Sequence, residues 1–485
     1  METRVARAAR LRCARLLAAA AALAIEAALL AGCAHIPFVD EARLLARAPR
    51  MAEIRLDGPH GPLDERVSAR QLDRLAAQAP DPRAFKRYLA VEQAVAGSPI
   101  YVDNSVRVLR NGAQTFPAIF AAIAGAKHYV YLEYYIFEDV RSGGRSLGDL
   151  LVEKSREGVA ISIIYDAFGS LDTPGRFHAR LRAAHIRITA FNPLDPLAGR
   201  RHYSPNSRDH RKILVVDGAV AIIGGVNLSS DYESAPHVER VAGPAPPHEL
   251  WHDIDVEIRG PAVARVAGLF RAQWRAATGR ALAQSEPASA SPQVGTQLVR
   301  RRAGTQLVRI IGSSPRLAPR YYATVISAMR GAHGSILVTA AYFVPTHQEM
   351  AALRSAARRG VDVELLLPSH SDSPPALAIQ RSHYASLLRA GVRLYERQGG
   401  IVHSKTLVVD GIWSLVGSSN FDERSVLFND EIDAVILGRS TARQLRAAFE
   451  AGVRRAKRIT REDVRRRGFL ERLRGWFWRL WEPLF

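Results

Sequence analysis

Two short segments of the chain carry the same reactive side chains at the same spacing. Each fits H-x-K-x4-D followed by G-[GS]-x-N, and the shared positions are His210, Lys212, Asp217, Gly225 and Asn227 in the first segment and His403, Lys405, Asp410, Ser418 and Asn420 in the second. An imidazole can act as a nucleophile or move a proton, while ammonium, amide and hydroxyl groups donate hydrogen bonds to phosphate oxygens. The doubled pattern predicts one phosphate-handling site that is assembled from two halves.

The residues around each motif predict a β-hairpin. In the first segment, aliphatic runs at 213–216 and 219–223 are separated by Asp217 and Gly218, a pair that favours a tight turn. On a strand, His210 and Lys212 face the same side because they are two residues apart. Asp217 is part of the catalytic motif, but its place at the turn favours a structural role, and the same holds for Asp410.

Lysine is rare in this chain. Only six of its 67 basic residues are lysines, and two of these six occupy the motif positions Lys212 and Lys405. Lysine presents a compact charge on a flexible stem, whereas arginine presents a planar fork. The choice of lysine at both positions therefore indicates a chemical role; two hairpins with solvated basic edges would not require it.

The motifs and their surroundings resemble the phospholipase D superfamily, and within it the bacterial cardiolipin synthase branch. The matching stretches are 106–112, 131–139, 158–170, 420–425 and 429–431. The resemblance implies an α/β fold of two pseudo-symmetric phospholipase D-like domains. Each would be a mixed β-sheet flanked by helices, with the active site at the interface between the domains.

The resemblance also implies a role for each motif residue. One histidine attacks phosphorus and forms a phosphohistidine, and the other moves the proton; we expect His210 as nucleophile and His403 as acid and base, although the pseudo-symmetry leaves the reverse order open. Asp253 and Glu431 occupy the places of carboxylates that orient the histidines. The expected phosphate contacts are Lys212, Lys405, Asn227, Asn420, Gly225 and Ser418. No cofactor or metal is expected, because the lysines supply positive charge and no Cys or His cluster has ligand spacing.

Repeated helix–strand pairs support the two-domain interpretation. Helices alternating with apolar strands indicate α/β layers. The repeated pairs are 118–126 with 130–137 and 323–332 with 336–343, then 147–157 with 159–165 and 350–359 with 361–367. They predict one domain at 97–283 and a second at 304–460.

The remaining segments are interpreted as connections. Residues 33–96 are expected to form a tether and helical region, and the Ser/Ala/Pro-rich stretch within 284–303 is a linker. The sequence Gly-Thr-Gln-Leu-Val-Arg occurs at 295–300 and again at 304–309, and one copy is expected to begin the second domain. The first half also carries extra Pro- and Gly-rich residues between Asn227 and Asp253, which predict a loop near the site.

The N-terminus predicts a lipoprotein. Residues 1–32 combine a basic region with a short apolar core, and Leu30-Ala-Gly-Cys33 resembles a lipobox, with lipidation at Cys33. The only other cysteine is Cys13, so the mature chain would have no disulfide. We expect a lipid-anchored envelope protein facing the periplasm, with Ala34 favouring the outer membrane; an ordinary signal peptide is the alternative. Cardiolipin synthases typically carry transmembrane helices instead.

Charge and the C-terminus point to a membrane surface. The net charge of +20 favours anionic partners. Residues 461–485 predict a basic amphipathic helix that either lies in the membrane interface or packs on the second domain. Its apolar face comprises Phe469, Leu473, Trp476, Phe477, Leu480 and Leu484. The expected partners are anionic phospholipids such as phosphatidylglycerol, and the aromatic helix argues against nucleic acid.

Three functions remain open on the sequence. The favoured one is phosphatidyl transfer that makes cardiolipin from phosphatidylglycerol. The second is a phospholipase D-type hydrolase or nuclease that uses water as the acceptor. The third is a non-catalytic lipid-binding lipoprotein, which the intact twin motifs argue against. Glu133 and Tyr135 could line the cleft or belong to the core.

Overall fold

The computed structural model describes residues 36–40, 43–44, 46, 48–49, 53–193, 206–232, 251–282, 303–315 and 320–482. The predicted signal peptide 1–32 and Cys33 lie outside the described residues. So do most of the linker 284–303 and most of the extra loop between Asn227 and Asp253.

The first domain is built on a seven-stranded mixed sheet with the strand order β8-β7-β4-β10-β11-β13-β3. Its strands are β3 (Ile100–Arg110), β4 (Tyr129–Tyr134), β7 (Ala160–Asp166), β8 (Arg187–Phe191), β10 (Lys212–Val216), β11 (Val220–Gly224) and β13 (Ile254–Arg259). Its helices are α5 (Asn111–Ala124), α6 (Leu147–Arg156), α7 (Gly175–Ala183) and α8 (Val263–Thr278). A small β5–β6 hairpin (Arg141–Ser142, Arg145–Ser146) precedes α6.

The second domain repeats this order as β17-β16-β15-β19-β20-β21-β14, with β22 added at the edge. Its strands are β14 (Gln306–Ser313), β15 (Ser335–Thr339), β16 (Asp362–Pro368), β17 (Arg393–Arg397), β19 (Thr406–Val409), β20 (Trp413–Gly417), β21 (Asn429–Leu437) and β22 (Ala456–Ile459). Its helices are α10 (Arg320–Arg330), α11 (His347–Arg358), α12 (Pro374–Ala390), α13 (Glu423–Leu427) and α14 (Arg439–Val453). The equal strand orders confirm the predicted pseudo-symmetric α/β fold.

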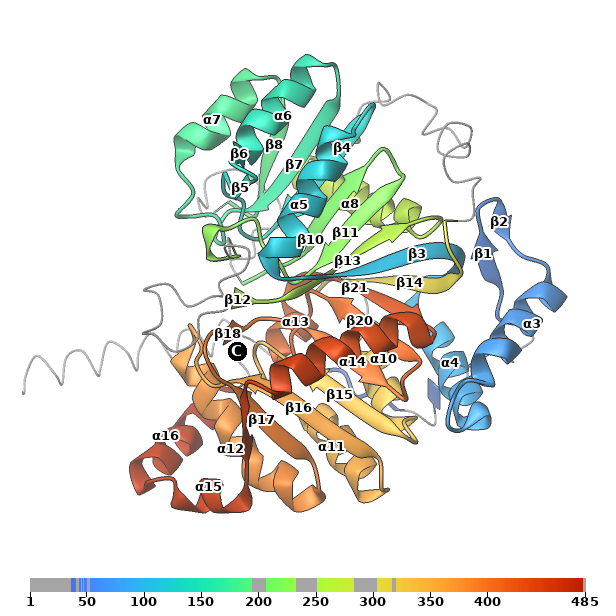
Figure 1. Ribbon diagram of the computed structural model, residues 1–485, viewed down its shortest axis with the longest axis vertical. Helices are drawn as coiled ribbons and strands as arrows, with labels where there is room; N and C mark the ends of the chain where they lie inside the picture. The colour runs from blue at the N-terminus through green and yellow to red at the C-terminus, as the bar shows by residue number, and fades with distance from the viewer. Residues whose placement is uncertain are drawn as a thin grey trace, which may run out of the picture.

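The two sheets meet edge to edge and share a core. Strands β3 and β14 pair antiparallel, so the sheets are continuous across the domain boundary. Helices α8 and α14 contribute apolar side chains to one buried cluster with strands of both domains, including Val256 and Ile432. The other helices cover the outer faces, as Figure 1 shows. A shared core of this kind fixes how the two motifs face each other.

The described segments before β3 and after β22 pack largely on the second domain. Helix α4 (Pro82–Ala96) contacts α10, follows α3 (Glu65–Ala76), and is preceded by the short strands β1 (Leu56–Gly58) and β2 (Gly61–Pro62). At the other end, α15 (Arg461–Arg466) leads into α16 (Phe469–Arg479), which lies along α12. The prediction of one helix over 461–485 is wrong, because the extended backbone at Arg467 divides the described part into α15 and α16. Of the two predicted positions, the contact with α12 bears out packing on the second domain. No helix within the described ranges is long and apolar enough to cross a membrane.

The predicted helices and strands are present, with shifted ends. The clearest difference is α5, which begins at Asn111 although the sequence predicts a start at Ala118. Pro117 lies inside this helix and removes one backbone donor. The helix continues through it because Phe116 and Ile119 are buried against the outer core of the first domain.

Candidate active site

The hairpins that carry the motifs form as predicted. β10 pairs with β11, and β19 pairs with β20, each in antiparallel register. The turn residues Asp217 and Gly218 have φ values of 52° and 64°, and Asp410 and Gly411 have 54° and 66°. Positive φ at both central positions is the property of the type I′ hairpin turn.

Asp217 and Asp410 lie at these turns. The Asp217 carboxylate accepts from the backbone N–H groups of residues 127, 128 and 129 at 2.7–2.9 Å. Asp410 accepts in the same way from residues 333, 334 and 335. Each motif aspartate therefore ties its hairpin to the segment that begins the neighbouring strand.

Each motif histidine is held by a strand from the other domain. β9 (Arg208–Asp209) pairs parallel with the start of β21, and His210 N donates to the Asp430 carbonyl at 2.9 Å. β18 (Ile401–Val402) pairs parallel with β12 (Trp251–His252), and His403 N donates to the His252 carbonyl at 2.8 Å. In both cases the next residue of the partner strand is the orienting carboxylate, so the two domains exchange carboxylates.

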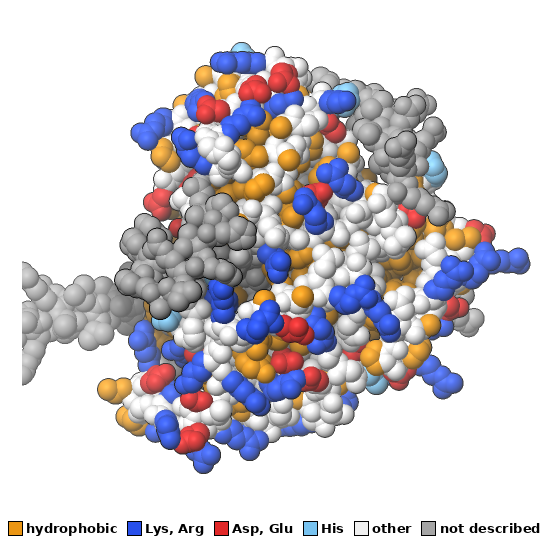
Figure 2. Space-filling view, viewed as in Figure 1, with side chains coloured by type: hydrophobic (Ala, Val, Ile, Leu, Met, Phe, Trp, Pro, Cys, Tyr) orange, Lys and Arg blue, Asp and Glu red, His pale blue; other side chains and the backbone are white. Residues whose placement is uncertain are grey.

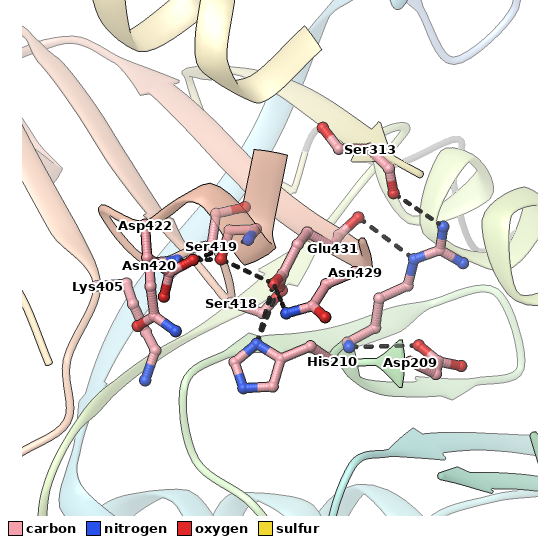
Figure 3. A network of polar contacts seen from close by, with 12 residues as sticks. Asp209, His210, Ser313, Lys405, Ser418, Ser419, Asn420, Asp422, Asn429 and Glu431 are labelled. Atoms are coloured by element: carbon pink, nitrogen blue, oxygen red, sulfur yellow. Dashed lines mark hydrogen bonds and ion pairs between the residues drawn. The ribbon is translucent and has the colours of Figure 1, made fainter. Parts of the chain in front are cut away.

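His210 is oriented by Glu431. Its Nδ1 lies 3.1 Å from both carboxylate oxygens, and Figure 3 shows the ring edge directed at this carboxylate. The same carboxylate also accepts from Ser418 Oγ, from Ser425 Oγ at 3.1 Å and from Asn429 Nδ2 at 3.2 Å. With Nδ1 engaged, Nε2 is the ring atom left for chemistry.

His403 is oriented by Asp253. Its Nδ1 lies 2.7 Å from Asp253 Oδ2 and 2.9 Å from the hydroxyl of Tyr232, at the end of η2 (Ser230–Tyr232). The Trp251 ring packs beside the imidazole at 4.7 Å between ring centroids. The sequence gives no sign of the Tyr232 contact, because the second half has no matching tyrosine at that distance from its motif.

The two orienting carboxylates differ in their ionisation. Burial acts to raise the pKa of Glu431, but the attraction and hydrogen bond of His210, together with Lys212 and Ser418, outweigh it and hold that pKa below the ordinary value. Burial raises the pKa of Asp253 to about 7, against the opposing pull of Lys405. At neutral pH Glu431 is thus an anion, whereas Asp253 is close to its titration midpoint.

The two motif lysines are buried beside their histidines. Lys212 Nζ donates to the His210 carbonyl at 2.7 Å, and Lys405 Nζ lies 2.8 Å from His403 Nδ1. Burial lowers the pKa of Lys212 to about 7 and that of Lys405 to about 8. Burial, with these two ammonium groups nearby, also holds the pKa of His403 well below its ordinary value.

A cavity of about 280 Å³ opens above the two histidines. His210 and His403 line it together with the predicted asparagines Asn227 and Asn420. Its wall residues come from both domains: Tyr135, Arg208, Trp251, Tyr342, Asp372, Ala376, Asp422, Arg424 and Asn429. The cavity therefore offers two imidazoles, three amides and two guanidinium groups to one ligand.

Gly225 and Ser418 lie against the orienting carboxylates. A Cβ on Gly225 would stand 2.2 Å from Asp253 Oδ1, so only glycine allows this approach. Ser418 Oγ donates to Glu431 and accepts from Ile432 N at 3.0 Å. Their contact with phosphate stays a prediction; the contacts that the structure does show position Asp253 and Glu431.

A second pair of carboxylates lies beneath the site. Asp255 accepts from Val226 N at 3.0 Å, and Asp433 accepts from Ser419 Oγ at 2.6 Å. Burial raises the pKa of each to about 8. Both belong to the repeated D/E-I-D segments in the sequence, where the pattern alone gives them no role. Each fixes the backbone after its hairpin.

A buried arginine joins the domains behind His210. Arg211 is the variable residue of the first H-x-K motif, where the second motif has Ser404. Its guanidinium contacts Glu133 at 3.2 Å and donates to the Glu431 carbonyl at 3.3 Å. Glu133 therefore belongs to the core, whereas Tyr135 lines the cavity, with its ring centroid 5.3 Å from that of His210.

Comparison with solved structures identifies the class of fold. The phosphatidylserine synthase of Haemophilus influenzae superposes with a TM-score of 0.60 at 13% identity, over 82% of this chain and 100% of that one. Two separate segments, 119–235 and 325–452, match the family model described as "Cardiolipin synthase, PLD-like domain". The fold and the doubled histidine site are those of a two-domain phospholipase D-like protein.

Curated sequences narrow this class to one family. A cardiolipin synthase of Geobacillus kaustophilus is 33% identical over 84% of this chain and 80% of its own length. Cardiolipin synthase A of Pseudomonas aeruginosa is 34% identical over 76% of this chain and 71% of its own length. The chain belongs to the cardiolipin synthase family of phospholipase D-like proteins.

Proposed function

We propose that this protein is a phosphatidyltransferase that makes cardiolipin from phosphatidylglycerol through a phosphohistidine. The observation that carries the proposal is the pair of imidazoles in one cavity, each held by a carboxylate from the opposite domain. Family membership supports the lipid substrate. The guanidinium groups of Arg208 and Arg424 in the cavity wall suit an anionic headgroup.

In the first step His210 is the nucleophile. Its Nε2 attacks the phosphorus of phosphatidylglycerol, and the bond from phosphorus to the glycerol oxygen breaks. The proton that His403 and Asp253 share passes from His403 to the leaving glycerol. The ionised Glu431 favours this assignment, because an anion at Nδ1 stabilises the positive ring of a phosphohistidine. Lys212 and Lys405 offset the charge that develops on the phosphate oxygens.

In the second step His403 acts as the base. It takes the proton from the glycerol hydroxyl of a second phosphatidylglycerol, whose oxygen attacks the phosphohistidine and releases His210. The sum is two phosphatidylglycerols converted to one cardiolipin and one glycerol. Asp253, with its pKa raised to about 7, stands 2.7 Å from His403 and can share the proton between the steps.

The deciding experiment is incubation of the purified protein with phosphatidylglycerol vesicles in the presence of EDTA, followed by mass spectrometry. We expect cardiolipin and free glycerol, both absent with His210→Ala and with His403→Ala. Phosphatidic acid as the main product would replace transfer by hydrolysis. Turnover that survives both substitutions would refute the two-histidine site.

We also propose that the protein works at the surface of a bacterial envelope membrane, where Cys33 is lipidated, and that α16 touches the lipid. This helix packs on α12 through the buried Gly475, yet Phe469, Leu470 and Trp476 are 61–77% exposed. Figure 2 shows hydrophobic side chains projecting at the lower left edge, where α16 lies. Trp478 packs against Val344 and Ala376, and both of these line the cavity. A membrane held by α16 would thus lie next to the site.

Vesicle co-sedimentation tests the helix. Replacing Trp476 and Phe477 by Ser should weaken binding to phosphatidylglycerol-containing vesicles about tenfold or more, since each aromatic ring loses its burial in lipid. Phe38→Ser is the matched control, because Phe38 is 78% exposed but lies outside α16. Equal binding by all three proteins would remove α16 from the membrane contact.

A further inference from the structure

A second cavity lies on the other side of the ribbon formed by β12 and β18. It has a volume of about 460 Å³ and borders the second domain at the carboxyl end of α14. Neighbouring residues of the ribbon face different cavities: Trp251 and His403 line the histidine cavity, and His252 and Ser404 line this one. The second cavity is therefore separate from the proposed reaction site but shares a wall with it.

This cavity is strongly basic. Its lining includes four arginines and one histidine, which come from four different parts of the fold: Arg110, His252, Arg397, and the adjacent Arg454 and Arg455. Among the described residues that line it, Asp253 is the only carboxylate, and that carboxylate is engaged with His403 at 2.7 Å.

Arg397 places positive charge at a buried position of this cavity. It is 7% exposed, and within the part of the chain that the structure describes its Nη1 donates only to the carbonyls of Gln398 at 2.9 Å and Gly399 at 3.2 Å. Burial and the nearby Arg455 lower the pKa of Arg397 to about 10. Burial and Arg397 lower the pKa of His252 to about 4. A buried guanidinium without a carboxylate partner is costly, and an anion would remove that cost.

Exposed arginines at the rim add positive charge to the cavity. Arg454 and Arg455 are exposed at the end of α14, and Gln398 N donates to the Arg455 carbonyl at 2.9 Å, which fixes this residue beside Arg397. The carboxyl end of a helix attracts cations and accounts for part of this charge. It does not account for Arg397 or Arg110, which lie on β17 and β3.

We propose that this cavity is a second anion site that binds a phosphate group through Arg397, Arg454 and Arg455. Arginine forks donate two parallel hydrogen bonds to phosphate, and such charge-assisted bonds are the strong ones. The phosphate can belong to an anionic phospholipid headgroup or be free in solution. Bound there, it stands next to the Asp253–His403 pair and favours the protonated form of that pair.

Binding measurements test the site without relying on turnover. Calorimetric titration of the full chain with inorganic phosphate and with micellar dihexanoyl phosphatidylglycerol would be compared among wild type, Arg397→Gln and the double variant Arg454→Gln/Arg455→Gln. We expect the dissociation constant for at least one ligand to rise about tenfold or more in both variants. Arg458→Gln is the matched control: it removes an exposed arginine of β22 outside the cavity and should bind as wild type does.

The two ligands separate the sources of the phosphate. An arginine-dependent affinity for inorganic phosphate as well as for the lipid would identify a general phosphate site, and dependence with the lipid alone would identify a headgroup site. The double variant keeps the test valid if Arg397→Gln fails to fold, because both of its residues are exposed. His210→Ala, which disables only the histidine cavity, should retain this binding even if the proposed transferase activity is absent. Equal affinities of wild type and the double variant for both ligands would overturn the proposal.

Discussion

The two halves of the site have the same backbone plan but different electrostatics. In the first half, His210 faces a glutamate that takes hydrogen bonds from three further side chains and stays ionised. In the second half, His403 faces an aspartate whose pKa is raised to about 7, with a tyrosine hydroxyl and an ammonium group on the same ring. A duplicated fold can therefore supply two unlike histidines, one suited to carry a phosphoryl group and one suited to move protons.

The largest expected effect is the loss of kcat when either histidine is removed. Removing either one should lower kcat by about 10⁴-fold or more, because nucleophile and acid/base act as a unit. Quenching the reaction with phosphatidylglycerol labelled at phosphorus should show the label on a peptide that contains His210. Label on a His403 peptide would make His403 the nucleophile and His210 the acid and base, while keeping the two-histidine mechanism.

The orienting carboxylates should differ in importance. Glu431→Gln removes an anion and should lower kcat by roughly 10²–10⁴-fold. The loss of kcat in Asp253→Asn should be at least tenfold smaller than in Glu431→Gln, since the amide resembles the protonated form that Asp253 partly adopts at pH 7. Rate measurements from pH 5.5 to 8.5 would add a second readout, because Asp253→Asn should remove an ionisation near pH 7. Equal losses in the two variants would show that the halves are electrostatically alike.

Crowding beneath Asp253 offers a smaller perturbation. Gly225→Ala places a methyl group 2.2 Å from Asp253 Oδ1 and must push that carboxylate away from His403. We expect kcat to fall by about 10- to 100-fold, because the displaced Asp253 carboxylate no longer holds His403 in position for proton transfer. Gly175→Ala, where the structure leaves open space for a Cβ, is the control and should change nothing. Wild-type rates for Gly225→Ala would exclude tight positioning of Asp253.

The smallest expected effect is on the free energy of unfolding, and it should be similar for Asp255 in the first half and Asp433 in the second. Burial raises the pKa values of Asp255 and Asp433 to about 8, so the folded protein holds protons that the unfolded chain releases above pH 3.8. Their favourable contribution is complete below about pH 3.8 and is lost as the pH rises towards 8. Asp255→Asn and Asp433→Asn should each gain about 1 kcal/mol or more relative to wild type between pH 5 and pH 8. Urea unfolding at pH 5 and at pH 8 measures the free energy of unfolding of each variant and of wild type. The same change with pH in variant and wild type would contradict the prediction.

The sequence predicts the fold well because its signals are local. The turn pair Asp217–Gly218, the alternation of apolar strands and helices, and the spacing of residues inside each motif all act within a few dozen residues. They locate both hairpins and all four repeated helix–strand pairs. The predicted start of α5 is wrong because it rests on the repeated pair that begins at 118. Only the burial of Phe116 and Ile119 explains why the helix extends back through Pro117 to Asn111.

The contacts between the carboxylates and the histidines of the site could not be predicted in the same way. The sequence indicates Asp253 and Glu431 as partners of the histidines, but it does not indicate which carboxylate serves which histidine. That depends on the β9–β21 and β12–β18 pairings between distant segments. The contacts of Tyr232 and Arg211 depend on the same pairings. Long-range register of this kind leaves no local periodicity in the chain.

The exchange of carboxylates also has a consequence during protein synthesis. When a ribosome has completed the first domain, His210 exists but Glu431 has not yet been made. A chain that ends before β21 therefore lacks the carboxylate that the complete fold holds 3.1 Å from His210 Nδ1.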